Sequence, residues 1–215
     1  MKSEIHEFQK NKSQSVSKNI LHLISSPRGT ESISTQLGNS ITNKLTEAFP
    51  GSRLITEDLN VNPYPHLFDK QINALRTQPD SHTTEQKELV RRSDEAIAQL
   101  FDADIIVISL PLYNFSIPST LKSWLDNILR AGHTFGYSSE GPKGLVNNKK
   151  VYIALASGNV YSDGPYQAYD FAVPYLKTVF GFIGITDVNI VRAEGTAIAG
   201  IMEGALAKAE ESFAV

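Results

Sequence analysis

The sequence predicts an α/β fold in three layers, in which a five-stranded parallel sheet is covered by helices on both faces. Three observations lead to this prediction. Five strand-like runs alternate with helix-like runs along the chain. One of them, residues 105–108, is wholly apolar, as a strand buried on both faces requires. The 215 residues are 41% hydrophobic and 20% charged, which is typical of a globular chain with a sizeable core.

The first half of the chain contains two strands, two helices and one irregular segment. Residues 19–25 form the first expected strand, and residues 34–49 an amphipathic helix that ends at a Pro-Gly pair. Residues 53–59 are more polar, which suits an edge strand. We expect residues 60–82, rich in proline and asparagine, to make a long irregular excursion. Residues 84–101 follow as a charged helix.

The second half continues the alternation. Residues 104–109 are the third expected strand, followed by a helix over residues 118–131, and residues 150–156 are the fourth strand.

A helix is expected over residues 166–182, where Pro174 either introduces a kink or marks the true start. Residues 188–193 are the fifth strand, and residues 198–213 the closing helix. Five strands of this kind suit the flavodoxin-like order 2-1-3-4-5. We expect residues 18–215 to form a single domain and residues 1–17, which are polar, to be a mobile tail.

Composition excludes several classes of function. The formal net charge of -3 gives no electrostatic basis for binding nucleic acid or an anionic membrane. The chain has no cysteine, which excludes disulfides, thiolate metal sites and a cysteine nucleophile. No apolar stretch approaches the roughly 18 residues of a membrane span, and the first residues lack the apolar centre of a signal peptide. We expect a cytoplasmic protein.

The loop after the first strand, residues 25–34, is rich in hydroxyl groups and opens onto a helix N-terminus. Backbone N–H groups and the positive end of the helix dipole favour an anion there. The alternative is ordinary helix capping by Ser32 or Ser34. The sequence lacks both the Gly-x-x-x-x-Gly-Lys-Ser/Thr and the Gly-x-Gly-x-x-Gly patterns. A single terminal phosphate, such as that of FMN, therefore fits best.

The loop after the third strand, residues 111–117, places aromatic side chains on both sides of Asn114. The aromatic rings would pack in the core under a purely structural interpretation. Their position at the carboxyl end of a strand favours contact with a flat cofactor instead. The Asn114 amide offers the donor and the acceptor that a flavin ring edge can use.

The loop after the fourth strand contains Gly158 and Asn159, both of which tolerate a left-handed backbone. Alone it could be a plain surface loop. The three loops follow strands one, three and four, however, and should converge on one crevice. The five histidines show no spacing typical of metal ligands, so we expect no metal site. Gly-x-Ser-x-Gly is absent, which argues against an α/β-hydrolase.

Several motifs together resemble one family. They are the segments 111–115, 130–137, 141–145, 163–165, 174–176 and 181–187, together with Leu121, Lys122 and Asp126. This combination resembles the FMN-dependent NADH-azoreductases and NAD(P)H:quinone oxidoreductases, and it extends from about residue 18 to near the C-terminus. The resemblance implies a flavodoxin-like homodimer with FMN bound in each subunit. It further implies a ping-pong reductase, in which NADH or NADPH binds and leaves before a quinone or an azo compound takes its place.

The resemblance also assigns positions to the cofactor and the acceptor. The cofactor-binding positions are Ser26, Ser32, Ile33, Ser34, Pro111, Leu112, Tyr113, Asn114, Phe115, Ala156, Ser157, Gly158 and Asn159. The acceptor pocket would be walled by Phe115, Phe135, Tyr137 and Tyr161. The chemistry would take place on the flavin, so no side chain is assigned as catalytic.

Three departures from the family pattern stand out. Residues 156–159 read Ala-Ser-Gly-Asn where the family usually has Ser-Arg-Gly-Gly. Tyr161 replaces a histidine found in some members, and Gly136 replaces an arginine found in others. Two alternatives remain open on the sequence: an electron carrier of the flavodoxin type, and an interaction module on the same scaffold without a nucleotide.

Overall fold

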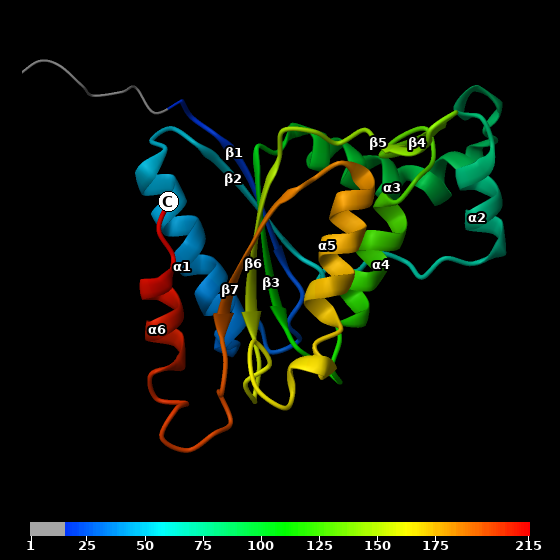
Figure 1. The fold of residues 1–215 in the computed structure, drawn as a ribbon. Coiled ribbons are helices and arrows are strands. Elements are labelled where there is room, and N and C mark those ends of the chain that lie inside the picture. Colours follow the sequence, from blue (N-terminus) through cyan, green and yellow to red (C-terminus); the bar gives the residue numbers. More distant parts are fainter. Residues whose placement is uncertain (1–15) are drawn as a thin grey trace, which may run out of the picture.

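The computed structural model describes residues 16–215, and Figure 1 shows their fold. Five parallel strands form one sheet in the order β2-β1-β3-β6-β7. The strands are β1 (Asn19–Ile24), β2 (Arg53–Asp58), β3 (Ile105–Pro111), β6 (Lys150–Ala156) and β7 (Asp187–Ala193). This order confirms the predicted 2-1-3-4-5 arrangement. Of the expected tail, residues 1–15 lie outside the described residues.

Helices cover both faces of this sheet (Figure 1). The helices are α1 (Ile33–Ala48) and α6 (Ala205–Ser212) on one face, and α3 (Thr84–Asp102), α4 (Ser119–Ile128) and α5 (Ala172–Ile183) on the other. Successive residues of a strand point to opposite faces. Accordingly, Ile105 and Val107 of β3 belong to the core under α1 and α6, while Ile106 and Ile108 belong to the core on the other side. The central strand is buried on both faces, as its apolar run predicts.

The excursion over residues 60–82 is more regular than expected. It contains α2 (Asp69–Arg76) and a 3₁₀ turn, Pro79–Ser81, and α2 packs against α3. The prediction of an irregular segment is therefore wrong at α2. The helix begins with Asp69 and ends with Arg76, so that each charge faces the helix end of opposite dipole sign.

Three further differences concern element bounds. A two-stranded hairpin, β4 (Phe135–Ser138) and β5 (Gly141–Gly144), was not anticipated. The helix expected from residue 166 begins at Ala172, which leaves Pro174 in its first turn, where no N–H is needed. The closing helix begins at Ala205 rather than at residue 198. The other predicted elements agree with the structure to within three residues at either end.

Strand register decides where the loops meet. Ile24 pairs with Ser109, and Pro111 pairs with Ala156, which pairs in turn with Ala193. The chain therefore leaves β1, β3, β6 and β7 at one edge of the sheet, the lower edge in Figure 1. This carboxyl edge is where ligands bind in open parallel sheets.

Candidate functional site at the carboxyl edge

The serine loop, residues 25–34, contains four buried serines, and Ser25 among them donates its hydroxyl to the Ser109 carbonyl. Ser26, Ser32 and Ser34 are all buried, and the Ser32 and Ser34 hydroxyl oxygens lie 2.9 Å apart. Ser32 is the N-cap of α1, but its side chain makes no capping hydrogen bond. The structure thus does not support ordinary capping as the role of Ser32. Within the described residues, the N–H groups of Ile33, Ser34 and Thr35 also donate to no acceptor, which leaves this helix start open to an anion.

A buried polar contact between β1 and β3 lies under α1. His22 Nε2 on β1 lies 2.8 Å from Ser109 Oγ on β3, and both side chains are buried. Gly38 of α1 packs directly on this pair, because a Cβ at Gly38 would lie 1.9 Å from Ser109 Oγ and 2.7 Å from His22 Nε2. Burial lowers the pKa of His22 to about 4, so the ring is neutral near pH 7. Sequence reasoning missed this trio, since one histidine in an apolar strand carries no obvious signal.

The aromatic turn after β3 has a strained backbone. Tyr113 and Ser116 exchange two backbone hydrogen bonds of 2.9 and 3.0 Å. Between them, Asn114 and Phe115 have φ values of 48° and 68°, the left-handed region that side chains other than glycine rarely occupy. Two such residues in succession cost free energy, and strain of this kind concentrates at ligand sites. The turn presents both side chains to solvent.

The loop after β6 lies directly beside the aromatic turn. Leu112 N–H donates to the Ala156 carbonyl at 2.7 Å, and the Ser157 hydroxyl donates to the Asn159 carbonyl at 2.8 Å. Gly158 and Asn159 tolerate a left-handed backbone, but neither has a positive φ in the structure. Their two N–H groups donate to no acceptor within the described residues. The structure thus brings the predicted cofactor-binding positions of these two loops together.

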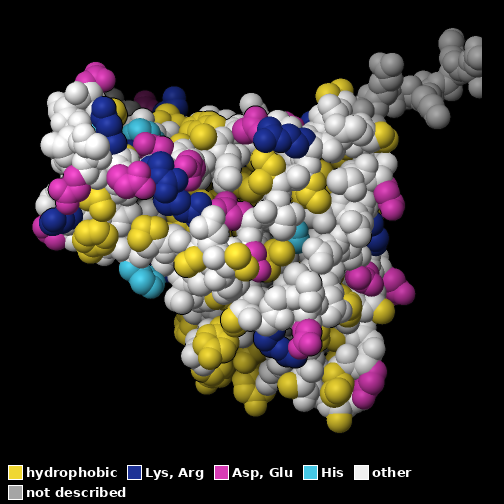
Figure 2. Space-filling model, turned by 180° about the vertical axis from the view of Figure 1, so that it is seen from behind, with side chains coloured by type: hydrophobic (Ala, Val, Ile, Leu, Met, Phe, Trp, Pro, Cys, Tyr) yellow, Lys and Arg dark blue, Asp and Glu magenta, His cyan; other side chains and the backbone are white. Residues whose placement is uncertain are grey.

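Four aromatic rings gather at the same edge. We call Phe115, Tyr161, Tyr166 and Tyr169 the aromatic quartet. Phe115 lies 6.4 Å from Tyr161 and 5.7 Å from Tyr169 between ring centroids, and Tyr166 lies 6.4 and 6.3 Å from the same two tyrosines. Each ring thus lies next to two of the other three. Figure 2 shows hydrophobic side chains gathered at the lower end of the molecule, where this edge lies. The sequence motifs placed Phe115 and Tyr161 in the predicted acceptor pocket but did not point to Tyr166 and Tyr169, which follow the Gly164-Pro165 pair.

Phe135 and Tyr137, the other two residues of the predicted acceptor pocket, lie elsewhere in the same chain. The Phe135 ring packs 4.6 Å from that of Phe182, at the end of α5. Phe115 instead adjoins the start of α5, because its carbonyl accepts from the Phe171 N–H at 3.1 Å. Eleven residues of helix separate these two positions, roughly 16 Å at 1.5 Å per residue. One chain alone does not bring the two pairs of aromatic residues together.

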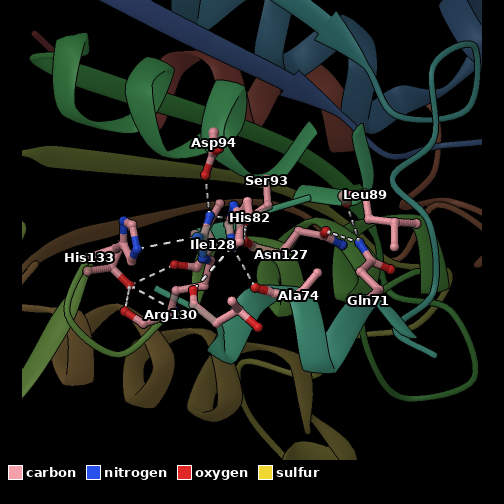
Figure 3. A network of polar contacts seen from close by, with 12 residues as sticks. Gln71, Ala74, His82, Leu89, Ser93, Asp94, Asn127, Ile128, Arg130 and His133 are labelled. Carbon is pink, nitrogen blue, oxygen red and sulfur yellow. Dashed lines mark hydrogen bonds and ion pairs between the residues drawn. The ribbon is translucent and has the colours of Figure 1, made fainter. Parts of the chain in front are cut away.

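A polar network supports the loop that leads to Phe135 (Figure 3). Arg130 donates to Asp94 at 2.5 Å, to the Ser93 hydroxyl at 3.0 Å and to His133 Nε2 at 3.3 Å. Burial, and then the Arg130 charge, lower the pKa of His133, consistent with a neutral ring that accepts this bond. A hollow of about 740 Å³ lies beside the network, lined by Leu75 and Arg76 among others.

Two searches of residues 16–215 bear on other functions. No three His, Asp or Glu side chains in this range gather closely enough to hold a metal ion. No helix in it is both long and apolar enough to cross a membrane.

Comparison with known proteins identifies the family. A family model described as having a flavodoxin-like fold matches residues 18–214. FMN-dependent NADH:quinone oxidoreductase 1 of Rhizobium etli is 50% identical over 178 residues, which cover 83% of this chain and 87% of the relative. An FMN-dependent NADH:quinone oxidoreductase of Agrobacterium fabrum is 45% identical over 193 residues, or 89% of this chain and 94% of that protein.

Solved structures agree with the sequence comparisons. An azoreductase of Bacillus anthracis superimposes with a TM-score of 0.81 at 30% identity, covering 90% of this chain and 97% of that one. An FMN-dependent NADH-azoreductase of the same species, solved in complex with FMN, gives a TM-score of 0.80 with the same identity and coverage. The motifs at residues 111–115 and 130–137 therefore indicate the family correctly, and the chain belongs to the flavodoxin-like family of FMN-dependent NADH:quinone oxidoreductases and azoreductases.

Proposed function

We propose that this chain is an FMN-dependent reductase that delivers two electrons from NADH or NADPH to quinones and aromatic azo compounds by a ping-pong mechanism. The observation that supports this most is the juxtaposition of two unlike features at one edge of the sheet. A buried hydroxyl cradle after β1 opens on a helix start, and a strained aromatic turn follows the neighbouring strand, β3. The first suits a phosphate and the second a flat ring system.

The serine loop fits the phosphate of FMN. The free N–H groups of Ile33, Ser34 and Thr35 are donors without acceptors, and the buried Thr35 hydroxyl in the same turn also lacks a partner within the described residues. Buried polar groups left unpaired are costly, which favours a ligand that accepts from them. A dianionic phosphate at a helix N-terminus satisfies both hydrogen bonding and charge.

The two neighbouring loops fit the ring. Asn114 stands at the tip of the aromatic turn with an amide that can both donate and accept. The free N–H groups of Gly158 and Asn159 supply further donors for a ring edge. Because these donors belong to the backbone, the departure from Ser-Arg-Gly-Gly at residues 156–159 leaves them in place.

Each group of residues has a different role in the proposed reaction. Bound FMN supplies the hydride chemistry, accepting from the nicotinamide and donating to the acceptor. The serine loop anchors the phosphate, and the turn at residues 113–116 fixes the plane of the ring. The aromatic quartet offers faces on which planar molecules stack. Donor and acceptor would stack on these same faces and would therefore bind in turn, which supports a ping-pong order.

We also propose a homodimer. One face of α5 is exposed and mostly apolar or small, with Phe171, Pro174, Thr178 and Gly181 at helical spacing. Such a stripe suits packing against a second helix. A two-fold axis across the middle of α5 would exchange its ends. The hairpin with Phe135 and Tyr137 would then meet the aromatic quartet of the other copy, and the predicted four-residue acceptor pocket would be completed between two chains.

An anaerobic titration tests the function. The purified protein is loaded with FMN, NADH is added without oxygen while the flavin absorption is recorded, and 1,4-benzoquinone follows. We expect bleaching by NADH alone and full recovery on adding the quinone, with parallel double-reciprocal plots in steady state. Flavin that binds but is reduced by neither NADH nor NADPH would indicate an electron carrier. Failure to bind FMN would contradict the site assignment.

A further inference from the structure

Arg192, near the end of β7, joins two carboxylates that belong to different segments of the chain. Its guanidinium donates to Asp170 Oδ2 at 2.5 Å and to Glu194 Oε1 at 3.3 Å. All three side chains are largely buried, with 18%, 7% and 12% of their surfaces exposed. We call Arg192, Asp170 and Glu194 the Arg192 clamp. Neither the motifs of the sequence nor the proposed cofactor site assigns it a role.

The Glu194 arm holds the segment that carries Tyr161. Glu194 Oε1 accepts from the backbone N–H groups of Tyr161 at 2.8 Å and Ser162 at 2.9 Å. Its other oxygen accepts from the Ser162 hydroxyl. These bonds fix the main chain at Tyr161 and leave its ring free to contact Phe115 and Tyr166.

The Asp170 arm holds the opposite side of the quartet. Asp170 lies between Tyr169 and Phe171, and its Oδ1 accepts from the Val173 N–H at 3.0 Å in the first turn of α5. The Phe171 N–H donates to the Phe115 carbonyl, as described above. Asp170 is therefore the sequence neighbour of Tyr169 and of Phe171, the residue that is hydrogen-bonded to Phe115.

We propose that the Arg192 clamp positions the aromatic quartet and thereby makes the site selective for planar aromatic acceptors over compact ones. This inference rests on the proposed reductase function and names a positioning residue for its acceptor site. The ring centroids lie 5.7 to 6.4 Å apart, within the range in which edge-to-face contacts are favourable. Phe115, Tyr166 and Tyr169 are about half exposed, so burial alone does not fix them. Their spacing depends on the main chain beneath, which the clamp ties together.

The chemistry of arginine matters for this role. Its planar group presents several donors in fixed directions and can serve two carboxylates at once, whereas lysine is a single point charge. Arg192→Lys keeps the charge that the buried carboxylates need but cannot span both. The variant should therefore fold with FMN bound. The segment with Tyr161 and the segment with Tyr169 would no longer be joined through one side chain.

The test compares two acceptors in the FMN-loaded enzyme. For Arg192→Lys we expect the KM for 1,4-naphthoquinone to rise about tenfold with little change in kcat. The kcat/KM for ferricyanide, which does not stack, should stay within about twofold. The calorimetric Kd of anthraquinone-2-sulfonate, measured without NADH, should rise by a similar factor, while the Kd of FMN stays constant. Arg53→Lys is the matched control, because Arg53 pairs with Asp102 at an exposed site far from the loops.

A second variant keeps the proposal falsifiable if Arg192→Lys does not fold. Glu194→Gln retains an oxygen that accepts from the Tyr161 N–H but removes the charge that Arg192 binds, and it should show the same selective rise in KM. Equal effects on naphthoquinone and ferricyanide, or no effect on either, would overturn the role of the clamp. Reduction of FMN by NADH in the parent protein is measured first. Failure of that step would contradict the reductase function itself.

Discussion

The serine loop and the aromatic quartet lie at the same edge of the sheet but are built in opposite ways. The serine loop is ten consecutive residues whose key hydroxyls are buried, and it rests on a polar contact inside the core. The quartet combines four residues spread over residues 115–169, most of them about half exposed, and depends on charged groups of a distant strand. One end of the site is determined locally and the other by tertiary structure. Changes at the first end should therefore affect stability and cofactor affinity together, whereas changes at the second should affect acceptor choice alone.

The largest expected effect comes from acid acting on the support of the serine loop. The pKa of His22 is about 4 in the folded chain and 6.5 unperturbed, so between these values the unfolded chain binds more protons. The contribution of His22 to stability is complete above pH 6.5 and is lost as pH falls toward 4, by about 3 kcal/mol. Urea denaturation at pH 7, 5.5 and 4.5 measures it. A His22→Gln variant with the same pH dependence would contradict this origin.

The next effect tests how closely α1 must approach the sheet. Gly38→Ala adds a Cβ that overlaps Ser109 Oγ, and overpacking of this kind costs typically about 2 kcal/mol. We expect a lower free energy of unfolding and weaker FMN binding, measured by denaturation and by flavin fluorescence. Gly136→Ala is the control for stability, since a Cβ there meets nothing within 4 Å. If both variants unfold alike, the close contact at Gly38 does not determine the position of α1.

A smaller effect distinguishes binding of the FMN phosphate from binding of the flavin ring. Ser34→Ala removes one buried donor, and a hydrogen bond to a charged group contributes about 1.5 kcal/mol or more, equal to about tenfold in affinity. We expect that loss for FMN and none for riboflavin, which lacks the phosphate. The ratio of the two dissociation constants, from fluorescence titration, is the measurement. An equal loss for both flavins would place Ser34 outside the phosphate site.

The smallest effect concerns the strained turn. Asn114→Ala places a less tolerant residue at φ 48° and removes the amide, so FMN should be held about fivefold more weakly or reduced more slowly. Asn114→Gly relaxes the backbone and removes the same amide, which separates strain from side-chain contact. Stopped-flow reduction and flavin titration give both quantities. Unchanged affinity and turnover in the Ala variant would remove Asn114 from the site.

Sequence reasoning predicted the features that depend on short segments of the chain. It missed those that depend on contacts between segments far apart in the sequence. Most of the strands follow from apolar runs, the more polar β2 was expected as an edge strand, and the strand order follows from the fold class. The hairpin was missed because Gly141–Gly144 contains two glycines and a proline, which disfavour strands. In the structure Gly144 packs against the end of α5, where a Cβ would overlap the Gly184 nitrogen, so glycine is needed at this strand position.

Only two of the four residues of the aromatic quartet were expected from the sequence, for the same reason. Arg192 and Glu194 stand out as charges directly after the apolar pair Ile190 and Val191, and this is the one signal that could have identified the clamp. What they bind, at Tyr161 and Asp170, is visible only in three dimensions.

The way the clamp holds its targets has a consequence for how this enzyme can diversify. Glu194 and Asp170 bind main-chain N–H groups, not the rings of the tyrosines beside them. A substitution at Tyr161, Tyr166 or Tyr169 therefore changes the face that meets an acceptor and leaves the scaffold intact. New acceptor preferences can arise here by single replacements, without loss of the flavin, and libraries randomised at these three positions are the place to look for them.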